Sequence, residues 1–344
     1  MRGGGARVRA VEAPEALAEA VEALRLGRTV AMPTETVYGL AADALNPRAV
    51  AEIFSLKARP HFDPLIMHVH PAHPLDEWVE WPRWLDPIRE AFWPGPLTMI
   101  LKRRAPVPDL VSAGLETVGL RCPGHPSALA LLEAFGGPLA APSANRFGRI
   151  SPTTAQAVAE ELGAGPAVIL DAGPCAVGVE STIIDLSAAR SLDDPIPLLR
   201  PGGLPREALT TMGLKLTSPA REEMIGRAPG TLDSHYAPRQ PLYLIEGEGR
   251  PSQPEREGDQ LLSWSSLPTA HAGEVLSPSG SDQEAAARLF LLLRRLDQAG
   301  ARIFAERAPA QGLGVAINDR LFRASVGVAR WDGERWLLSA RAQT

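Results

Sequence analysis

Lysine and cysteine are scarce in this chain of 344 residues. Lysine occurs at Lys57, Lys102 and Lys215 against thirty-two arginines, so the position of each lysine is informative. The two cysteines, Cys122 and Cys175, form no CxxC motif and have no metal-ligand spacing. This usage excludes a CxxC-type metal site and is typical of a protein of the reducing cytoplasm.

Long apolar segments are also missing. No run approaches the ~18 residues that a membrane span requires, and no apolar stretch follows the N-terminal arginines as in a signal peptide. We therefore expect no membrane partner. The formal net charge of −5 excludes a wholly basic nucleic-acid coat, although a local basic cleft stays open. The length predicts about two domains, at roughly 150 residues per domain.

Short apolar runs alternate with amphipathic segments, which predicts an α/β protein. In the first part of the chain the predicted helices are 14–26 and 127–135, and the predicted strands are 29–33, 65–69, 99–101, 117–121, 139–141 and 168–170. The apolar pattern fades from 214 to 240, which predicts a linker. Beyond it, strands at 241–245, 261–264 and 301–305 and a helix at 283–298 predict a smaller α/β domain. The expected division is therefore 1–213, 214–240 and 241–344.

Two cations lie on a turn between a predicted helix and a predicted strand. Lys57 and Arg59 come where the helical pattern ends, and Pro60 and Pro64 prevent its continuation. On such a turn they could face a polyanion such as a nucleotide phosphate. The alternative is a solvated basic turn beside Asp63.

A polar loop follows the predicted strand 29–33. It begins with Thr34, Glu35 and Thr36, so hydroxyls and a carboxylate gather at the end of a buried strand. In open α/β sheets this is where ligands bind. The alternative is a capped loop in which Thr34 and Thr36 bond to their own backbone.

The loop 142–153 is the second informative segment. Its small residues allow close approach of a ligand to the backbone, and Ser143, Asn145 and Ser151 supply hydrogen bonds. We expect Ser151 and Pro152 to begin a helix, as N-cap and first residue, and a helix N-terminus with hydroxyls nearby can bind phosphate. An ordinary capped loop is the alternative. No GxGxxG or GxxxxGK[ST] motif is present, so the sequence lacks the signatures of Rossmann dinucleotide binding and of Walker-type ATPases.

Arginines recur at the ends of regular elements. Arg59, Arg121 and Arg200 each lie at or just beyond a predicted helix or strand. Together with Lys57 they supply the charge and the donors that a triphosphate needs. The linker adds His235 and adjacent Tyr236, which would suit a lid over a ligand; a plain tether is the alternative.

Taken together, seven segments resemble the YrdC-like family, in particular its two-domain threonylcarbamoyl-AMP synthases. They are Pro33–Leu40, Lys57–Pro60 with Pro64, Leu65 and His68, Pro94–Thr98, Pro142–Asn145 with Ser151–Thr153, Glu180–Thr182, Arg200–Gly202 and His235–Pro238. Residues 312–321 resemble the second domain of the longer members. The chain departs from the family pattern at Arg146-Phe147-Gly148 and at Thr231-Leu232-Asp233.

The resemblance implies a fold and a reaction. The fold would be a twisted, open, mixed sheet with flanking helices, followed by a smaller C-terminal α/β domain. The enzyme would be a nucleotidyltransferase that makes threonylcarbamoyl-AMP and pyrophosphate from L-threonine, bicarbonate or carbon dioxide, and ATP with Mg²⁺. The product would serve to modify adenosine beside the anticodon of certain tRNAs, and a contact with tRNA or with a tRNA-modification enzyme is left open.

The resemblance also implies site residues. Lys57 and Arg59 would neutralise the phosphates as catalytic groups, and Mg²⁺ would be held mainly by the phosphates. The implied ATP site comprises Lys57, Arg59, His61, Thr117, Ser143, Asn145, Ser151, Arg200 and Tyr236. The implied threonine site comprises Thr34, His68, Arg121, Ala141 and Ser181, with Arg121 pairing with the carboxylate. His68 as a buried strand histidine, and Ala141 acting through its backbone, are the alternatives for those two.

Two other functions compete with this interpretation. A double-stranded RNA or tRNA-binding module without ATP turnover would use Lys102, Arg103 and Arg104 with Arg146 and Arg149. It would show steep salt dependence. A carbamoyl-transfer relative of the hydrogenase-maturation type would need acylphosphatase-like and zinc-finger segments, for which the chain has neither the cysteines nor the length.

Overall fold

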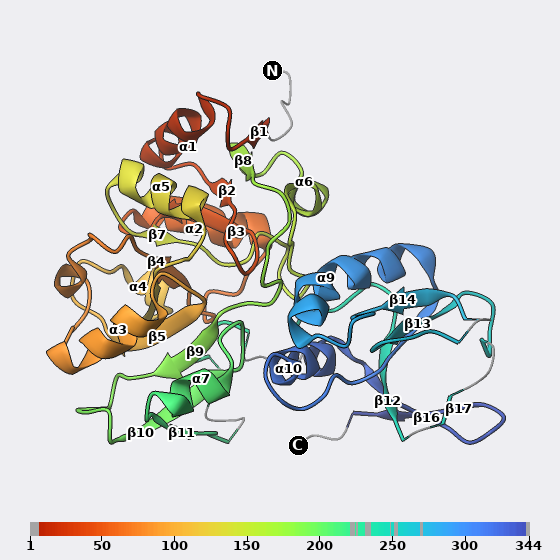
Figure 1. Ribbon diagram of the computed structural model, residues 1–344. Coiled ribbons are helices and arrows are strands. Elements are labelled where there is room, and N and C mark those ends of the chain that lie inside the picture. The colour runs from red at the N-terminus through yellow and green to blue at the C-terminus, as the bar shows by residue number, and fades with distance from the viewer. Residues whose placement is uncertain are drawn as a thin grey trace. The chain divides into compact units, whose positions relative to one another are not determined.

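The computed structural model describes residues 7–220, 224, 226–230, 235–247, 249–250, 254–268 and 271–341. The chain divides into two compact units. Unit 1 is Met1–Phe147 with Ser151–Thr231, and unit 2 is Gly148–Ile150 with Leu232–Thr344. Each has its own sheet (Figure 1). The sequence departure at 231–233 lies outside the described residues.

Unit 1 is built on an eleven-stranded sheet in the order β1-β8-β2-β3-β7-β4-β6-β5-β9-β10-β11. Parallel pairs such as β4–β6 and antiparallel pairs such as β5–β6 both occur, so the predicted mixed sheet is confirmed. The strands are β1 (Arg7–Ala10), β2 (Val30–Met32), β3 (Gly39–Asp43), β4 (Ile66–His68), β5 (Leu97–Lys102), β6 (Thr117–Arg121), β7 (Leu139–Ala140), β8 (Val168–Asp171), β9 (Thr182–Asp185), β10 (Pro195–Arg200) and β11 (Lys215–Thr217).

Helices cover this sheet on both faces. They are α1 (Ala16–Arg25), α2 (Pro47–Lys57), α3 (Asp86–Phe92), α4 (Asp109–Ser112), α5 (Pro126–Phe135), α6 (Ala155–Leu162) and α7 (Arg206–Thr211), with short 3₁₀ turns at Leu75–Glu77 and Arg83–Leu85. Residues of α1 and α5 form one apolar cluster with β2, β7 and β8. Residues of α2, α3, α4, α6 and α7 form the larger cluster on the other face.

On the sheet face that α1 and α5 cover in part, strands β4, β6 and β5 are covered by other residues. Leu139, in the α1 and α5 cluster, lies opposite His68 of β4, so β4 turns His68 and Ile66 to that same face. Ile66 is paired with Gly119 of β6, which is paired with Ile100 of β5. Here the apolar cluster is small, and its described members outside the strands are Ala228 and Met224. Polar side chains therefore gain access to this half of the sheet.

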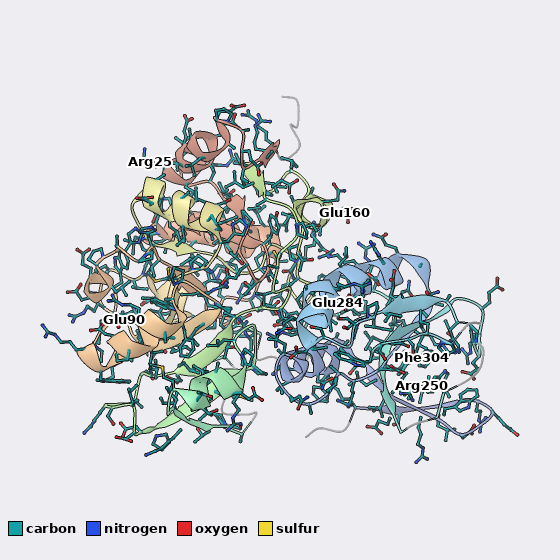
Figure 2. All side chains as sticks on the ribbon, in the orientation of Figure 1. Arg25, Glu90, Glu160, Arg250, Glu284 and Phe304 are labelled. Atoms are coloured by element: carbon teal, nitrogen blue, oxygen red, sulfur yellow. The ribbon has the colours of Figure 1, made fainter. Side chains whose placement is uncertain are left out.

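Unit 2 contains a six-stranded sheet in the order β14-β13-β15-β12-β16-β17. It is parallel except for the β16–β17 pair at one edge. Its core includes Phe304, stacked on Trp336 with ring centroids 4.7 Å apart (Figure 2). The strands are β12 (Leu242–Glu246), β13 (Asp259–Ser263), β14 (Gly273–Val275), β15 (Arg302–Ala305), β16 (Gly327–Trp331) and β17 (Trp336–Ala340), and the helices are α9 (Asp282–Ala299) and α10 (Gly314–Ala324). The predicted C-terminal α/β domain is confirmed.

One predicted helix start is wrong. Ser151 and Pro152 precede α6 without joining it, because Thr154 is the N-cap and accepts a hydrogen bond of 3.2 Å from the amide of Ala157. Ser151 is instead fully buried, and its hydroxyl donates to Glu180 at 2.5 Å. A buried carboxylate competes successfully for that hydroxyl since it would otherwise lose hydrogen bonds that it makes in water.

Six strands lie where none was expected: β1, β3, β11, β14, β16 and β17. β3 begins at Gly39 inside the segment read as a polar loop, and β11 occupies the first residues of the segment 214–240 read as a linker. Both are short, so their apolar pattern is too brief to indicate a strand by itself. In the described part of the chain, no helix has the length and apolar character needed to cross a membrane.

Candidate functional site

The last residue of α2, Lys57, is held inside unit 1. Asn46 caps the start of this helix, and Ala58 ends it in the left-handed conformation at φ 49°. The Lys57 ammonium is buried and donates to the backbone carbonyls of Ser143 and Asn145, each at 2.5 Å. Two family segments, Lys57–Pro60 and Pro142–Asn145, therefore meet through one ammonium group.

Arg59 is buried on the turn that follows α2. Its Nη2 lies 2.9 Å from the Asp63 carboxylate, and its guanidinium also donates to the carbonyls of Asp63 and Pro64. The ring of Phe147, one of the departures from the family pattern, has its centroid 6.0 Å from the guanidinium carbon. The alternative of a solvated basic turn is wrong, because Lys57, Arg59 and Asp63 are all buried.

These charges influence one another strongly. Burial, with Arg59 nearby, lowers the pKa of Lys57 well below its usual 10.5. Burial raises the pKa of Asp63, while Arg59, Lys57 and Arg200 act in the opposite direction. Three cations thus lie within electrostatic reach of one carboxyl group, and an anionic ligand placed among them would gain from all three.

Cross-strand pairing places a second set of groups on the sheet face formed by β4, β6, β5, β9 and β10. His68 lies opposite Arg121, and Thr98, Ile183 and Arg200 lie opposite one another in β5, β9 and β10. Side chains of paired residues point to the same side, and every second residue of a strand shares a face. The set therefore shares a face with Ile66, Gly119 and Ile100.

Arg200 ties this set together. Its Nε and Nη2 donate to the carbonyl of Ser181, and Nη2 also reaches the Ser181 hydroxyl, which lies 2.8 Å from the hydroxyl of Thr98. Gly202 lies so close to β9 that a Cβ atom there would be 2.3 Å from the carbonyl oxygen of Glu180. The glycine of this segment is required for that approach.

The loop after β2 combines a local and a long-range role. The Thr34 hydroxyl donates to the carbonyl of Val37 and accepts from the amides of Thr36 and Val37, so the alternative of a capped loop describes Thr34 correctly. The next residue, Glu35, reaches across to Arg121, with 2.7 Å between Oε1 and Nη2. Glu35 was not among the predicted site residues.

His68 is neutral over the ordinary pH range. It is buried, and burial together with the charge of Arg121 lowers its pKa from 6.5 to about 3. Its Nδ1 has no hydrogen-bond partner among the described residues. A neutral imidazole next to Arg121 can accept or donate one hydrogen bond to a ligand without adding charge.

The other predicted residues are placed as follows. Ala141 is buried and donates its amide to the carbonyl of Ile66, Thr117 begins β6 on the face of Gly119, and His61 is exposed and stacks on Phe54. Tyr236 belongs to unit 2, where it is buried against Phe290 and Arg320. In unit 1, the structure brings together Lys57, Arg59, Ser143 and Asn145, and on the sheet face His68, Arg121, Ser181 and, through the Glu35 loop, Thr34. Arg200 links the two sets, because it bonds to Ser181 and lies within electrostatic reach of Asp63.

Besides Glu35, the sequence reasoning left Thr98 and Glu180 out of the site. All three stand inside the recognised segments, and Glu35 and Glu180 adjoin the chosen residues Thr34 and Ser181. Their positions become informative once pairing is known, because Thr98 faces Ser181 and Glu180 faces Ser151. No sequence spacing signals either contact.

Chain residues close over this half of the sheet. Arg227 pairs with Asp185, and the Pro229 carbonyl accepts from Arg200 at 2.9 Å. A cavity of about 10 Å³ remains between Arg227, Pro229 and the strand residues, room for about one water molecule. A ligand larger than one water molecule does not fit in this cavity as it stands.

The basic triplet proposed for RNA binding is largely engaged within unit 1. Arg103 donates to the carbonyls of Leu115 and Val107, and Arg104 donates to the carbonyl of Val79. Guanidinium groups fixed to backbone carbonyls are poorly placed to follow a phosphate backbone. These contacts argue against the RNA-binding module.

Two family models match consecutive parts of the chain. The model described as "Telomere recombination" matches residues 22–202, and the model described as "Threonylcarbamoyl-AMP synthase, C-terminal domain" matches residues 204–326. Between them they span the regions on which units 1 and 2 are built.

Similar proteins cover nearly the full chain. A protein of Pyrococcus abyssi named threonylcarbamoyl-AMP synthase is 39% identical over 317 residues, which cover 88% of this chain and 92% of that protein. A protein of the same name from Bacillus subtilis is 38% identical over 90% of this chain and 93% of its own length. A crystal structure of Sua5 from P. abyssi complexed with L-threonine is similar with a TM-score of 0.81 and 36% identity, over 90% of this chain and 94% of that one.

Proposed function

This chain belongs to the family of two-domain threonylcarbamoyl-AMP synthases, and we propose that it is itself such an enzyme. It would act as a nucleotidyltransferase: L-threonine, bicarbonate and ATP give threonylcarbamoyl-AMP, pyrophosphate and water. The observation that carries the proposal is that Lys57, Arg59 and Arg200 all act on the buried carboxyl group of Asp63 in unit 1. On the adjoining part of the face, Arg121 and neutral His68 would receive an amino acid.

The cationic group suits the phosphates of ATP. Lys57 supplies a point charge held by two carbonyls, whereas Arg59 and Arg200 supply planar groups with several N–H donors. Charge on the leaving pyrophosphate grows as the bond from the α-phosphorus breaks, so donors fixed beforehand stabilise the transition state more than the ground state. Ser143 and Asn145 would orient the nucleotide from the loop that Lys57 fixes.

The amino-acid group suits L-threonine. The Arg121 guanidinium would pair with the carboxylate, and His68, Ser181 and the Thr34 loop would border the side chain. The amino group, after losing a proton, attacks the carbon of bicarbonate or carbon dioxide, and the resulting carbamate oxygen attacks the α-phosphorus. Positioning of two reactants and charge stabilisation supply the catalysis, since the reaction needs no protein nucleophile.

Magnesium would enter with the nucleotide. In the described ranges, no three or more His, Cys, Asp or Glu side chains are grouped so that they could hold a metal ion. The groups next to Lys57 are the Arg59 guanidinium, backbone carbonyls and the single carboxylate of Asp63, which is paired with Arg59. That set fits a Mg²⁺ bound through phosphate oxygens, where it would neutralise their charge.

The cellular role follows from the family as a proposal. Threonylcarbamoyl-AMP would be consumed in the modification of adenosine next to the anticodon of tRNA, in the cytoplasm. A direct contact of the chain with tRNA or with the enzyme that uses the product would be a separate property. The proposal also includes binding of the ribose and the base of ATP, and a role for Tyr236 in the ATP site.

One assay tests the activity. Purified protein is incubated with ATP, Mg²⁺, L-threonine and bicarbonate, and pyrophosphate release is followed together with formation of the adenylate by mass spectrometry. Release should require both L-threonine and bicarbonate. Release that is independent of either one, or none at all under any of the conditions, would contradict the proposal.

A further inference from the structure

We infer that Glu35 is the group that recognises the α-amino group of the amino-acid substrate, so that the site selects amino acids over the corresponding hydroxy acids. The inference rests on the proposed function, because that function places the substrate carboxylate at Arg121. It adds a contact for the reacting nitrogen, which none of the residues assigned above provides.

The Glu35 carboxylate is fixed inside unit 1. Its backbone carbonyl accepts a hydrogen bond of 2.7 Å from the amide of Val177, which holds the residue at the head of the loop between β2 and β3. The side chain is 14% exposed, and both carboxylate oxygens are closed off from solvent. Oε1 lies 2.7 Å from Nη2 of Arg121. The negative charge is therefore buried and directed at the binding position.

This carboxylate lacks the donors that a buried anion needs. Neither oxygen accepts a hydrogen bond of regular geometry from any described residue, and Nη2 of Arg121 makes none either. Charge attraction between them remains, but a carboxylate can accept about four hydrogen bonds, and each buried acceptor left without one is costly. Donors from a ligand would satisfy both groups.

The titratable groups near Glu35 and Arg121 do not contribute further charges. Burial raises the pKa of the Cys122 and Cys175 thiols to about 12, and burial lowers the pKa of His125. His68, next to Arg121, is neutral as well. These neighbours therefore add no charge beside the ion pair of Glu35 and Arg121.

A zwitterionic α-amino acid is complementary to such a pair. Its ammonium and carboxylate are attached to the same carbon, and the charges of Glu35 and Arg121 are also adjacent. The carboxylate would bind the remaining N–H groups of Arg121, and the ammonium would donate to Glu35. Charge-assisted hydrogen bonds of this kind are short and strong. They would also fix the nitrogen from which the carbamate forms.

The opposite role makes a different prediction. Glu35 could instead occupy Arg121 in place of the substrate carboxylate and have to leave before binding. Removing its charge would then strengthen binding of any carboxylate, with or without an amino group. Recognition of the ammonium requires the reverse, a loss confined to ligands that carry the amino group.

Binding experiments on the full chain separate these roles. Affinities are measured by calorimetry, without nucleotide, for L-threonine and for the hydroxy acid in which a hydroxyl replaces its amino group. The wild type should prefer L-threonine by about tenfold to a hundredfold, the value of one hydrogen bond to a charged group. Glu35→Gln should lose most of that preference. Glu90→Gln, a change of the same kind at an exposed position of α3, should keep it (Figure 2).

If Glu35→Gln does not fold, Glu35→Asp replaces it, because aspartate keeps the negative charge on a side chain that is one methylene shorter. Its preference for L-threonine should fall between those of the wild type and Glu35→Gln. A folded Glu35→Gln or Glu35→Asp protein with the full preference of the wild type would overturn the inference. Tighter binding of both ligands would overturn it too. Failure of the proposed function would be seen separately, as wild-type protein that releases no pyrophosphate.

Discussion

Arg200 and Ser181 are joined by three hydrogen bonds: Nε and Nη2 of the guanidinium reach the carbonyl oxygen at 3.1 and 2.9 Å, and Nη2 reaches the hydroxyl at 3.1 Å. The first residue lies at the end of β10 and the second just before β9. One planar cation thus fixes the hydroxyl expected to face threonine and belongs to the group expected to face ATP. A shared residue of this kind couples the two halves of the site.

Replacing Arg200 by lysine should therefore affect stability as well as activity. An ammonium cannot reproduce the fork that engages Ser181 and the carbonyl of Pro229 together. We expect the free energy of unfolding to fall by about 2–4 kcal/mol. Urea denaturation measures it, with Arg25→Lys on the exposed side of α1 as the control (Figure 2). Equal stability of the two variants would show that the fork is dispensable.

Lys57→Ala should abolish pyrophosphate release. The ammonium is fixed by Ser143 and Asn145 at 2.5 Å, and loss of one such preorganised group typically slows catalysis by about a hundredfold or more. Lys102→Ala is a matched control, since Lys102 is exposed and pairs only loosely, at 3.9 Å, with Glu80. Turnover of Lys57→Ala near that of the control would remove Lys57 from the mechanism. Circular dichroism should show both variants folded.

His68 should make the protein less stable in acid. Its pKa is about 3 in the folded state and 6.5 when unperturbed, so between these values the unfolded chain binds a proton that the folded chain does not. The free energy of unfolding therefore falls as pH drops from 6.5 towards 3, by roughly 3–5 kcal/mol for this one group. Above 6.5 the contribution is constant.

The measurement for His68 is a comparison of pH profiles. His68→Gln keeps a buried amide of similar size and does not titrate. Subtracting its denaturation profile from that of the wild type cancels the acid sensitivity of other groups, such as Asp63 and His125. A difference that is flat between pH 3 and 6.5 would contradict the buried neutral imidazole.

The buried pair of Ser151 and Glu180 gives a further test. Ser151→Ala removes the hydroxyl that donates to the carboxylate at 2.5 Å, and we expect a loss of about 1–3 kcal/mol in the free energy of unfolding. Thr154→Ala removes the N-cap of α6 and should cost about 1 kcal/mol. If Ser151 were the helix cap instead, the Thr154 variant would be nearly neutral and helix content would fall with Ser151→Ala.

Much of the fold followed from local patterns. The strand at Thr117–Arg121 was predicted with the bounds that the structure has, and the helix at α5 differs by one residue. In β6 the apolar residues Val118 and Leu120 alternate with other residues, and in α5 Pro126 and Gly136 mark the two ends. Short strands such as β3 and β11 were missed because their apolar residues, three in a row in β3 and one in β11, do not show an alternating period. The prediction for Ser151 was wrong because Ser151 followed by Pro152 is typical of a helix start, whereas the Ser151 hydroxyl bonds to the buried carboxylate of Glu180.

By itself the sequence determined the segments that carry chemistry, from the scarce lysine at position 57 to the arginines at strand ends, and through them the family. The tertiary structure decided which side chains meet. Pairing of β4 with β6 sets His68 beside Arg121, and the loop after β2 brings Glu35 to the same guanidinium. The physical reason is that residue type and local period are written along the chain, whereas a buried contact depends on strand register and on which polar group most needs a partner away from water.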